Sequence, residues 1–187
     1  GGSPAREGIE LIKPIIDDID SLDNVGIAAT RLNATIIKEV LLQSGIDVNS
    51  EIPRDIDEAV DLFNRKSVLI MGGTNPGHTT DAVAIRLAIS CGASKCIIAT
   101  NVNGVFDEDP KINPDAKSYN LMTLEELKKI VGPAEHSKAG HSQVVDPIGV
   151  DDALRNRLTL KVLVGSIAQL IGKCLDGEDF QGTIIQG

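Results

Sequence analysis

The segment 67–81, which reads SVLIMGGTNPGHTTD, constrains the fold more than any other part of the chain. It opens with four apolar residues at 68–71, a pattern typical of a buried strand. Gly72 and Gly73 interrupt this run, and the hydroxyls and carboxylate at 79–81 precede an apolar-periodic stretch, AVAIRLAIS. The pattern therefore predicts a strand, then a glycine-containing loop, then a helix.

A strand–loop–helix unit of this kind suits a phosphorylated ligand. Glycines let backbone N–H groups approach a phosphate closely, and the N-terminus of a helix favours negative charge. An ordinary turn, with Thr or Asp capping the helix, explains the same residues. The segment alone does not choose between these two interpretations.

The rest of the chain alternates strands with helices. Such alternation predicts an α/β fold with a mainly parallel sheet covered by helices on both faces. Sheets of this class bind ligands beyond the carboxyl ends of their strands, and the polar loops 72–81 and 100–110 both follow apolar strands. Helices are predicted at 4–18, 28–44, 57–64, 80–89, 124–131, 147–155 and 168–175, and strands at 68–71, 96–100, 160–165 and 182–185.

Composition excludes several classes of function. The net charge of −9 disfavours binding to a nucleic-acid backbone, and three Phe, one Tyr and no Trp leave little for base stacking. The three Cys lack CxxC spacing and indicate a reducing compartment. His78, His136 and His141 lack metal-type spacing, so no metal ligand is predicted among them. No signal peptide or membrane-spanning run is visible, and a soluble cytoplasmic protein without membrane partners is expected.

Six segments follow one another along nearly the whole chain: GGxxARE at 1–7, DNVGIAATRLNA at 23–34, MGGTNPGHTTDAVA at 71–84, ATNVNGVFDEDPKINPDAK at 99–117, KAGHSQVVDP at 138–147 and GTII at 182–185. Together they resemble the amino-acid-kinase superfamily, and within it the archaeal-type uridylate (UMP) kinases. The resemblance implies one domain over 1–187, built as a three-layer sandwich around a mainly parallel sheet.

The resemblance also implies roles for individual residues. Asp81 matches the carboxylate that organises the transfer centre, and Asp23 matches the one that takes the ribose hydroxyls of the acceptor. The other residues implied to bind UMP are Gly1, Gly2, Arg6, Thr74, Gly77, Thr79 and Thr80. The residues implied to bind ATP are Thr100, Asn101, Phe106 and Asp109.

Plainer interpretations exist for some of these residues. Arg6 also reads as a solvated side chain in a first helical turn, Asp23 as a loop carboxylate, and 107–109 as a solvated acidic turn. The sequence departs from the family pattern at Asn103, where Asp is usual, and at Phe106, where Tyr is frequent. The family's first strand and the glycine-rich loop after it have no counterpart in this sequence. The start at Gly1, without Met, reads as an interior point of a longer protein.

The resemblance implies phosphoryl transfer from ATP to UMP, with Mg²⁺ bound to ATP and a hexamer assembled as a trimer of dimers. The apolar face of 28–44 is expected to form a subunit contact, unless it only covers the sheet. Two other functions fit the same fold. A related kinase with isopentenyl phosphate as acceptor needs an apolar slot in place of Asp23, and a non-catalytic nucleotide-binding or oxoanion-storing subunit would lose the acceptor residues.

Overall fold

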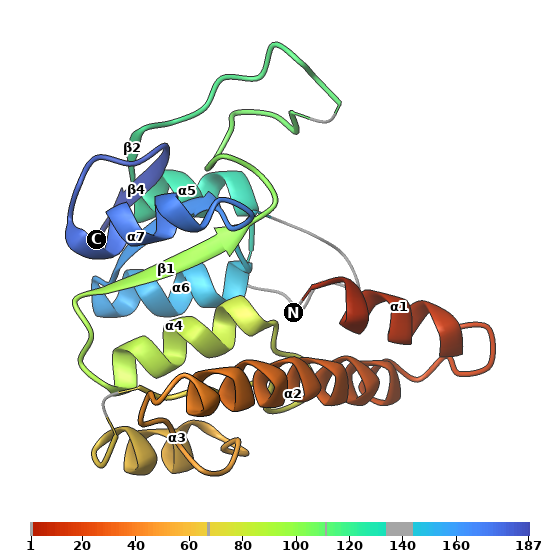
Figure 1. The fold of residues 1–187 in the computed structure, drawn as a ribbon. Helices are drawn as coiled ribbons and strands as arrows, with labels where there is room; N and C mark the ends of the chain where they lie inside the picture. The colour runs from red at the N-terminus through yellow and green to blue at the C-terminus, as the bar shows by residue number, and fades with distance from the viewer. Residues whose placement is uncertain (1, 67, 111, 134–143) are drawn as a thin grey trace. The chain divides into compact units, whose positions relative to one another are not determined.

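The computed structural model describes residues 2–66, 68–110, 112–133 and 144–187, and it divides into two compact units. The first unit comprises the described residues up to Cys91, and the second comprises those from Gly92 onward. Each unit has its own arrangement of elements (Figure 1). The single domain over 1–187 stays a prediction.

The first unit contains four helices among its described residues: α1 (Ser3–Ile12), α2 (Ile19–Gln43), α3 (Ile56–Phe63) and α4 (Thr80–Ser90). Helix α1 is shorter than the predicted 4–18, because Pro14 lacks an N–H group and its ring clashes with the preceding turn. Helix α2 begins nine residues before the predicted start at residue 28. Asp18 is its N-cap and accepts a hydrogen bond from the Ser21 N–H at 2.9 Å.

Helices α1 and α2 pack closely through glycines. A Cβ atom on Gly26 would lie 3.2 Å from Ile9 Cδ1, and one on Gly8 would lie 3.1 Å from Val25 Cγ1. These distances are tighter than ordinary van der Waals contact, so larger residues at either glycine would push the helices apart. Ile9 and Leu22 are buried in this part of the molecule.

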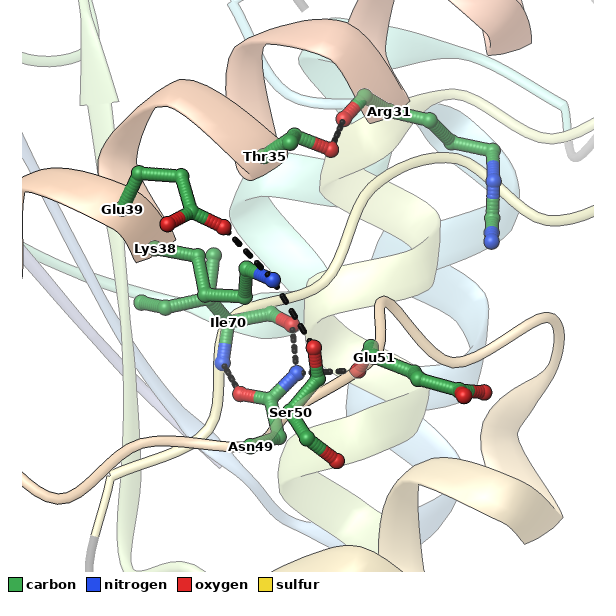
Figure 2. A network of polar contacts seen from close by, with 8 residues as sticks. All are labelled: Arg31, Thr35, Lys38, Glu39, Asn49, Ser50, Glu51 and Ile70. Atoms are coloured by element: carbon green, nitrogen blue, oxygen red, sulfur yellow. Dashed lines mark hydrogen bonds and ion pairs between the residues drawn. The ribbon is translucent and has the colours of Figure 1, made fainter. Parts of the chain in front are cut away.

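The predicted strand at 68–71 does not pair as a strand. Among the described residues, its ladder contact is a single parallel bridge between Val48 and Val68. The backbone of Ile70 bonds instead to the side chain of the fully buried Asn49: the Ile70 N–H donates to Oδ1 at 2.7 Å, and Nδ2 donates to the Ile70 carbonyl at 2.8 Å (Figure 2). The Asn49 amide thus satisfies groups that a neighbouring strand would otherwise pair, and the prediction of a regular strand was wrong.

The 49–53 segment is also tied to α2. Lys38 donates to the Ser50 carbonyl at 2.8 Å and pairs with Glu39 at 2.9 Å (Figure 2). The guanidinium of Arg31 donates to the carbonyls of Pro53 and Ile52 at 2.6 and 2.7 Å. Side chains of α2 therefore hold the loop that, through Asn49, supports the segment leading into 72–79.

The second unit is built on a four-stranded sheet in the order β1-β3-β4-β2. Strands β1 and β3 are parallel, β2 and β4 are parallel, and β3 and β4 are antiparallel, so the sheet is mixed. Helix α7 packs on β3, and α5 packs on β2, β4 and α6 (Figure 1). The elements are β1 (Lys95–Thr100), β2 (Leu121–Thr123), α5 (Leu124–Val131), α6 (Pro147–Asn156), β3 (Thr159–Val164), α7 (Ala168–Asp176) and β4 (Gly182–Gln186).

Most elements of this unit follow local signals. Strand β2 was not predicted, because three residues are too few for a periodic pattern. Helix α5 begins at the predicted residue 124 with a capping box: the Glu126 N–H donates to Thr123 Oγ1 at 3.2 Å, and the Thr123 N–H donates to Glu126 Oε2 at 2.8 Å. In the described parts of both units, we find no helix with the length and apolar character needed to cross a membrane.

Candidate functional site

The structure joins two of the predicted acceptor residues. Asp23 lies in α2, and its Oδ2 accepts a hydrogen bond from the Gly77 N–H at 2.7 Å, although the two residues are 54 positions apart. Gly77 has a φ of 82°, in the left-handed region that favours glycine. Asp23 is therefore a half-buried helical residue attached to the loop 72–79, and the interpretation as a loop carboxylate was wrong.

The two glycines that open this loop serve the packing of α2. A Cβ atom on Gly72 would lie 2.9 Å from Arg31 Cα, and one on Gly73 would lie 2.9 Å from Thr30 Oγ1. The Gly73 N–H donates to that hydroxyl at 2.7 Å. This N–H group is consequently satisfied within the protein, which revises the expectation that both glycines expose N–H groups to a phosphate.

Thr79 and Asp81 have different positions at the start of α4. Thr79 is the N-cap, and its Oγ1 accepts a hydrogen bond from the Ala82 N–H at 3.3 Å. Asp81 occupies the first helical turn and is half-buried, so it is not the cap. The N-terminal end of the helix dipole stabilises a carboxylate at this position.

His78 and Arg86 form a further contact in this region, which was not predicted from the sequence. Nη1 of Arg86, in α4, lies 2.7 Å from Nε2 of His78, in the loop. Because a guanidinium only donates hydrogen bonds, Arg86 is the donor in this contact and an imidazole nitrogen accepts. The pair anchors the loop to the helix that carries Asp81. The available signal was a loop His placed two helical turns before an Arg.

The other predicted acceptor residues are less closely connected. Arg6 is exposed on α1, and its N–H donates to the Gly2 carbonyl at 3.5 Å, while Gly2 is the N-cap with a φ of 97°. Thr74 and Thr80 are half-buried in the loop and at the start of α4. Gly1 lies outside the described residues.

A cavity of about 610 Å³ lies in the first unit between α2, the 69–72 segment and α4. Its lining is mainly apolar and includes Ile36, Leu69, Val83 and Leu87. Of the predicted site residues, Thr80 is the one that lines it. Its lining is more apolar than a phosphate site requires, and neither Asp23 nor Asp81 lines it.

The predicted ATP-side residues lie in the second unit, after strand β1. Thr100 ends β1, and its hydroxyl lies 3.5 Å from Oδ1 of Asn101. Phe106 is half-buried and forms an antiparallel bridge with Ser118. Asp109 is exposed, and its carbonyl accepts hydrogen bonds from two later N–H groups of the loop, at 3.0 and 2.8 Å.

The described residues predicted to bind UMP, together with Asp81, thus belong to the first unit, and those predicted to bind ATP belong to the second. Within the ranges that the structure describes, we find no cluster of three or more His, Cys, Asp or Glu side chains able to hold a metal ion. His136 and His141 lie outside those ranges.

Comparison with known proteins identifies relatives. Residues 3–162 match the model of the amino acid kinase family. The uridylate kinase of Methanococcus vannielii is 38% identical over 185 residues, which cover 99% of this chain and 79% of that protein. The uridylate kinase of Methanocaldococcus jannaschii is 37% identical over 187 residues, covering 100% of this chain and 80% of that protein.

Two solved structures that resemble this chain are also uridylate (UMP) kinases. The uridylate kinase from Archaeoglobus fulgidus superposes with a TM-score of 0.83 at 37% identity, covering 99% of this chain and 81% of that one. The UMP kinase from Bacillus anthracis superposes with a TM-score of 0.77 at 25% identity, covering 95% and 73%. Fold and sequence agree over nearly the whole chain, and the protein therefore belongs to the amino acid kinase family.

Proposed function

We propose that the protein is a uridylate kinase, which transfers the γ-phosphoryl group of ATP to UMP and releases UDP and ADP. The hydrogen bond between Asp23 and Gly77 carries this proposal, because it joins two residues of the predicted UMP site from distant parts of the sequence. The identity of 37–38% with archaeal uridylate kinases over essentially the whole chain supports it.

The residues of the first unit bind the acceptor in this proposal. Asp23 accepts hydrogen bonds from the ribose hydroxyls, and its attachment to Gly77 sets the distance between the ribose position and the loop. Arg6, with Gly1 and Gly2, neutralises the phosphate of UMP. The hydroxyls of Thr74, Thr79 and Thr80 lie in or next to the loop, where they donate to phosphate oxygens.

The residues of the second unit bind ATP. Phe106 offers an apolar surface to the adenine or ribose, and Thr100, Asn101 and Asp109 offer polar groups of the same loop. Mg²⁺ bound with ATP would supply charge neutralisation at the phosphates. In this proposal no side chain is assigned as a ligand of the ion, and Asp81 would orient water bound to it.

The chemical step needs no general base. An ionised phosphate oxygen of UMP attacks the γ-phosphorus, the bond from that phosphorus to the β,γ-bridging oxygen breaks, and ADP leaves with the electron pair. Positioning and charge neutralisation supply most of the catalysis. Asp81, held in the first turn of α4 beside the capping Thr79, orients the cationic groups around the transferred phosphoryl.

The acceptor is tested by coupled ADP-release assays with UMP, CMP, dUMP and isopentenyl phosphate. We expect UMP to give the highest kcat/KM. A preference for isopentenyl phosphate would contradict the acceptor assignment, and ATP binding without transfer to any acceptor would indicate a nucleotide-binding subunit instead.

The role of Asp23 is tested by Asp23→Asn, which keeps an oxygen for the Gly77 N–H but removes the charge. We expect the dissociation constant for UMP to rise by the equivalent of about 1–3 kcal/mol, as measured by calorimetry. Asp20→Asn is the matched control, because Asp20 is an exposed carboxylate one turn earlier in α2. Equal effects of the two changes would refute the role of Asp23.

We also propose that the protein is a homo-oligomer, a hexamer built as a trimer of dimers. Leu32, Ile36 and Val40 recur every four residues along α2 and are 60, 54 and 60% exposed in the single chain. An apolar stripe of this kind is typical of a subunit contact. Sedimentation velocity at micromolar concentration should show the hexamer, and a stable monomer would refute the proposal.

A further inference from the structure

The two ends of the segment 105–119, which carries Phe106 and Asp109, are hydrogen-bonded to each other and to the buried hydroxyl of Thr183. Val105 and Tyr119 mark the two ends of a long excursion between β1 and β2, and the Tyr119 N–H donates to the Val105 carbonyl at 2.9 Å. Next to this pair, Phe106 bridges Ser118 in antiparallel fashion. We call the paired residues 105–106 and 118–119 the base, and the whole segment 105–119 the excursion.

The hydroxyl of Thr183 joins both ends of this base. The Val105 N–H donates to Thr183 Oγ1 at 2.8 Å, and the same hydroxyl donates its proton to the Tyr119 carbonyl. Thr183 belongs to β4 and has no exposed surface. One side chain, 78 positions from Val105 and 64 from Tyr119, thus satisfies a donor at the start of the excursion and an acceptor at its end.

Gly104 shows how close this contact is. Its φ is 115°, which L side chains rarely adopt, and a Cβ atom there would lie 2.5 Å from Thr183 Oγ1 and 3.1 Å from the Thr183 backbone nitrogen. Glycine therefore meets a conformational and a spatial requirement at the same position. The chain passes directly over Thr183 just before it reaches Phe106.

A second set of bonds extends the base outward. The Asp107 N–H donates to the Lys117 carbonyl at 3.1 Å, and the Lys117 N–H donates to Asp107 Oδ1 at 2.8 Å. The exposed Asp109 follows two residues later, so its position depends on the paired segments 105–107 and 117–119. The bonds of Thr183 to Val105 and Tyr119, followed by those between Asp107 and Lys117, lead from the sheet to the predicted ATP-side residues.

We propose that Thr183 is a positioning residue for the donor nucleotide, whose hydroxyl fixes the base of 105–119 and thereby holds Phe106 and Asp109 where ATP is bound. This inference rests on the proposed function. Thr183 does not touch the nucleotide in this account. Its substitution acts on the ATP side, because both groups bonded to its hydroxyl belong to that excursion and the UMP-side residues belong to the first unit.

The test compares Thr183→Val with Thr183→Ser. Valine keeps the shape of the side chain but removes the hydroxyl, which leaves a buried N–H group and a carbonyl unpaired, whereas serine keeps the hydroxyl. For Thr183→Val we expect KM for ATP and the calorimetric dissociation constant for ATP to rise about tenfold, with KM for UMP within about twofold of wild type. Thr183→Ser should restore wild-type ATP binding to within about threefold.

Hydrogen exchange followed by mass spectrometry gives a readout besides activity. In Thr183→Val, amides of 105–119 should exchange faster, while those of α2 and α4 should be unchanged. If the valine variant does not fold, Thr183→Cys replaces it, because a thiol fills a similar space and hydrogen-bonds weakly. The same rise in KM for ATP is expected.

The possible failures are distinguishable. A folded Thr183→Val or Thr183→Cys variant with a normal KM for ATP would refute the role of Thr183, as would equal increases in the KM values for ATP and UMP. A wild-type protein that neither binds ATP nor phosphorylates UMP would refute the proposed function, and the donor-side role of Thr183 would fall with it.

Discussion

Replacing Thr30 by Val tests whether α2 holds the loop 72–79 through a single hydroxyl. Thr30 is 7% exposed, its Oγ1 accepts from the Gly73 N–H at 2.7 Å, and it donates to the Ile27 carbonyl at 2.8 Å. Valine has the same shape as threonine, but it places a methyl group where the hydroxyl oxygen accepts the hydrogen bond from the N–H of the buried Gly73. The variant therefore leaves one buried donor without a partner.

The expected cost follows from these contacts. An unsatisfied buried N–H group costs about 1–3 kcal/mol. The Ile27 carbonyl loses less, because a carbonyl inside a helix also accepts the backbone bond from four residues later. A methyl group is also too large for a position 2.7 Å from a nitrogen, so the loop must shift. We expect the free energy of unfolding to fall by about 2 kcal/mol.

Thr35→Val is a matched control on the same helix. Thr35 is exposed, and its hydroxyl donates to the Arg31 carbonyl at 2.9 Å, a local bond like that of Thr30 to Ile27 (Figure 2). It has no hydrogen bond to the loop among those seen in the structure. Thr35→Val should change stability by no more than about 0.5 kcal/mol, so the difference between the two variants isolates the bond to Gly73.

Urea unfolding followed by circular dichroism measures both variants. The same proteins are assayed for kinase activity. Because the proposed function assigns the loop 72–79 to UMP binding, Thr30→Val should raise KM for UMP while leaving KM for ATP unchanged. A difference in unfolding free energy below about 0.5 kcal/mol between the two variants would show that the bond between Thr30 and Gly73 does not stabilise the loop.

Three further substitutions test other parts of the molecule. Asn49→Leu removes three hydrogen bonds of a fully buried amide, two of them to Ile70, and should cost about 2–4 kcal/mol in urea unfolding; an effect under 0.5 kcal/mol would contradict this. The hydrogen bond from Lys128 holds the pKa of the Asp151 carboxyl in the folded protein below its ordinary value. The ionised carboxylate therefore stabilises the fold fully at pH values above the pKa of Asp in the unfolded chain, about 3.9. This contribution is lost as the pH falls through the lower pKa of the folded state. The stability difference between wild type and Asp151→Asn should therefore shrink when thermal unfolding is measured at successively lower pH, and a difference independent of pH would refute the linkage. Asp81→Asn should lower kcat about a hundredfold or more, with the melting temperature and the dissociation constant for UMP little changed, and a near-normal kcat would exclude Asp81 from the chemical step.

Local chemistry in the sequence determined many of the elements. The capping box of Thr123 and Glu126 spans three residues, so both partners are visible in the sequence, and α5 begins where it was predicted to begin. Two boundaries were missed although their signals were present. Helix α1 ends before Pro14, and Asp18 caps α2, whereas the apolar periodicity continues past the proline and becomes regular only well after the cap.

Less of the candidate site than of the helices and caps could be predicted from the sequence. Motif resemblance indicated Asp23, Gly77 and Asp81 as functional residues, but it did not predict that Asp23 bonds to Gly77 or that Thr79, not Asp81, caps α4. The segment at 68–71 has the composition of a strand, yet its backbone bonds to a side-chain amide because Asn49 lies beside it.

The tertiary structure alone decided which buried polar groups satisfy one another. Thr30 meets Gly73 across 43 positions, and Thr183 meets Val105 across 78. No periodicity or local propensity records such pairs, because the preference of a hydroxyl for a distant N–H group exists only once both are buried together. Helices and caps arise from interactions between near neighbours in the chain, whereas these contacts arise from the need of every buried donor for an acceptor.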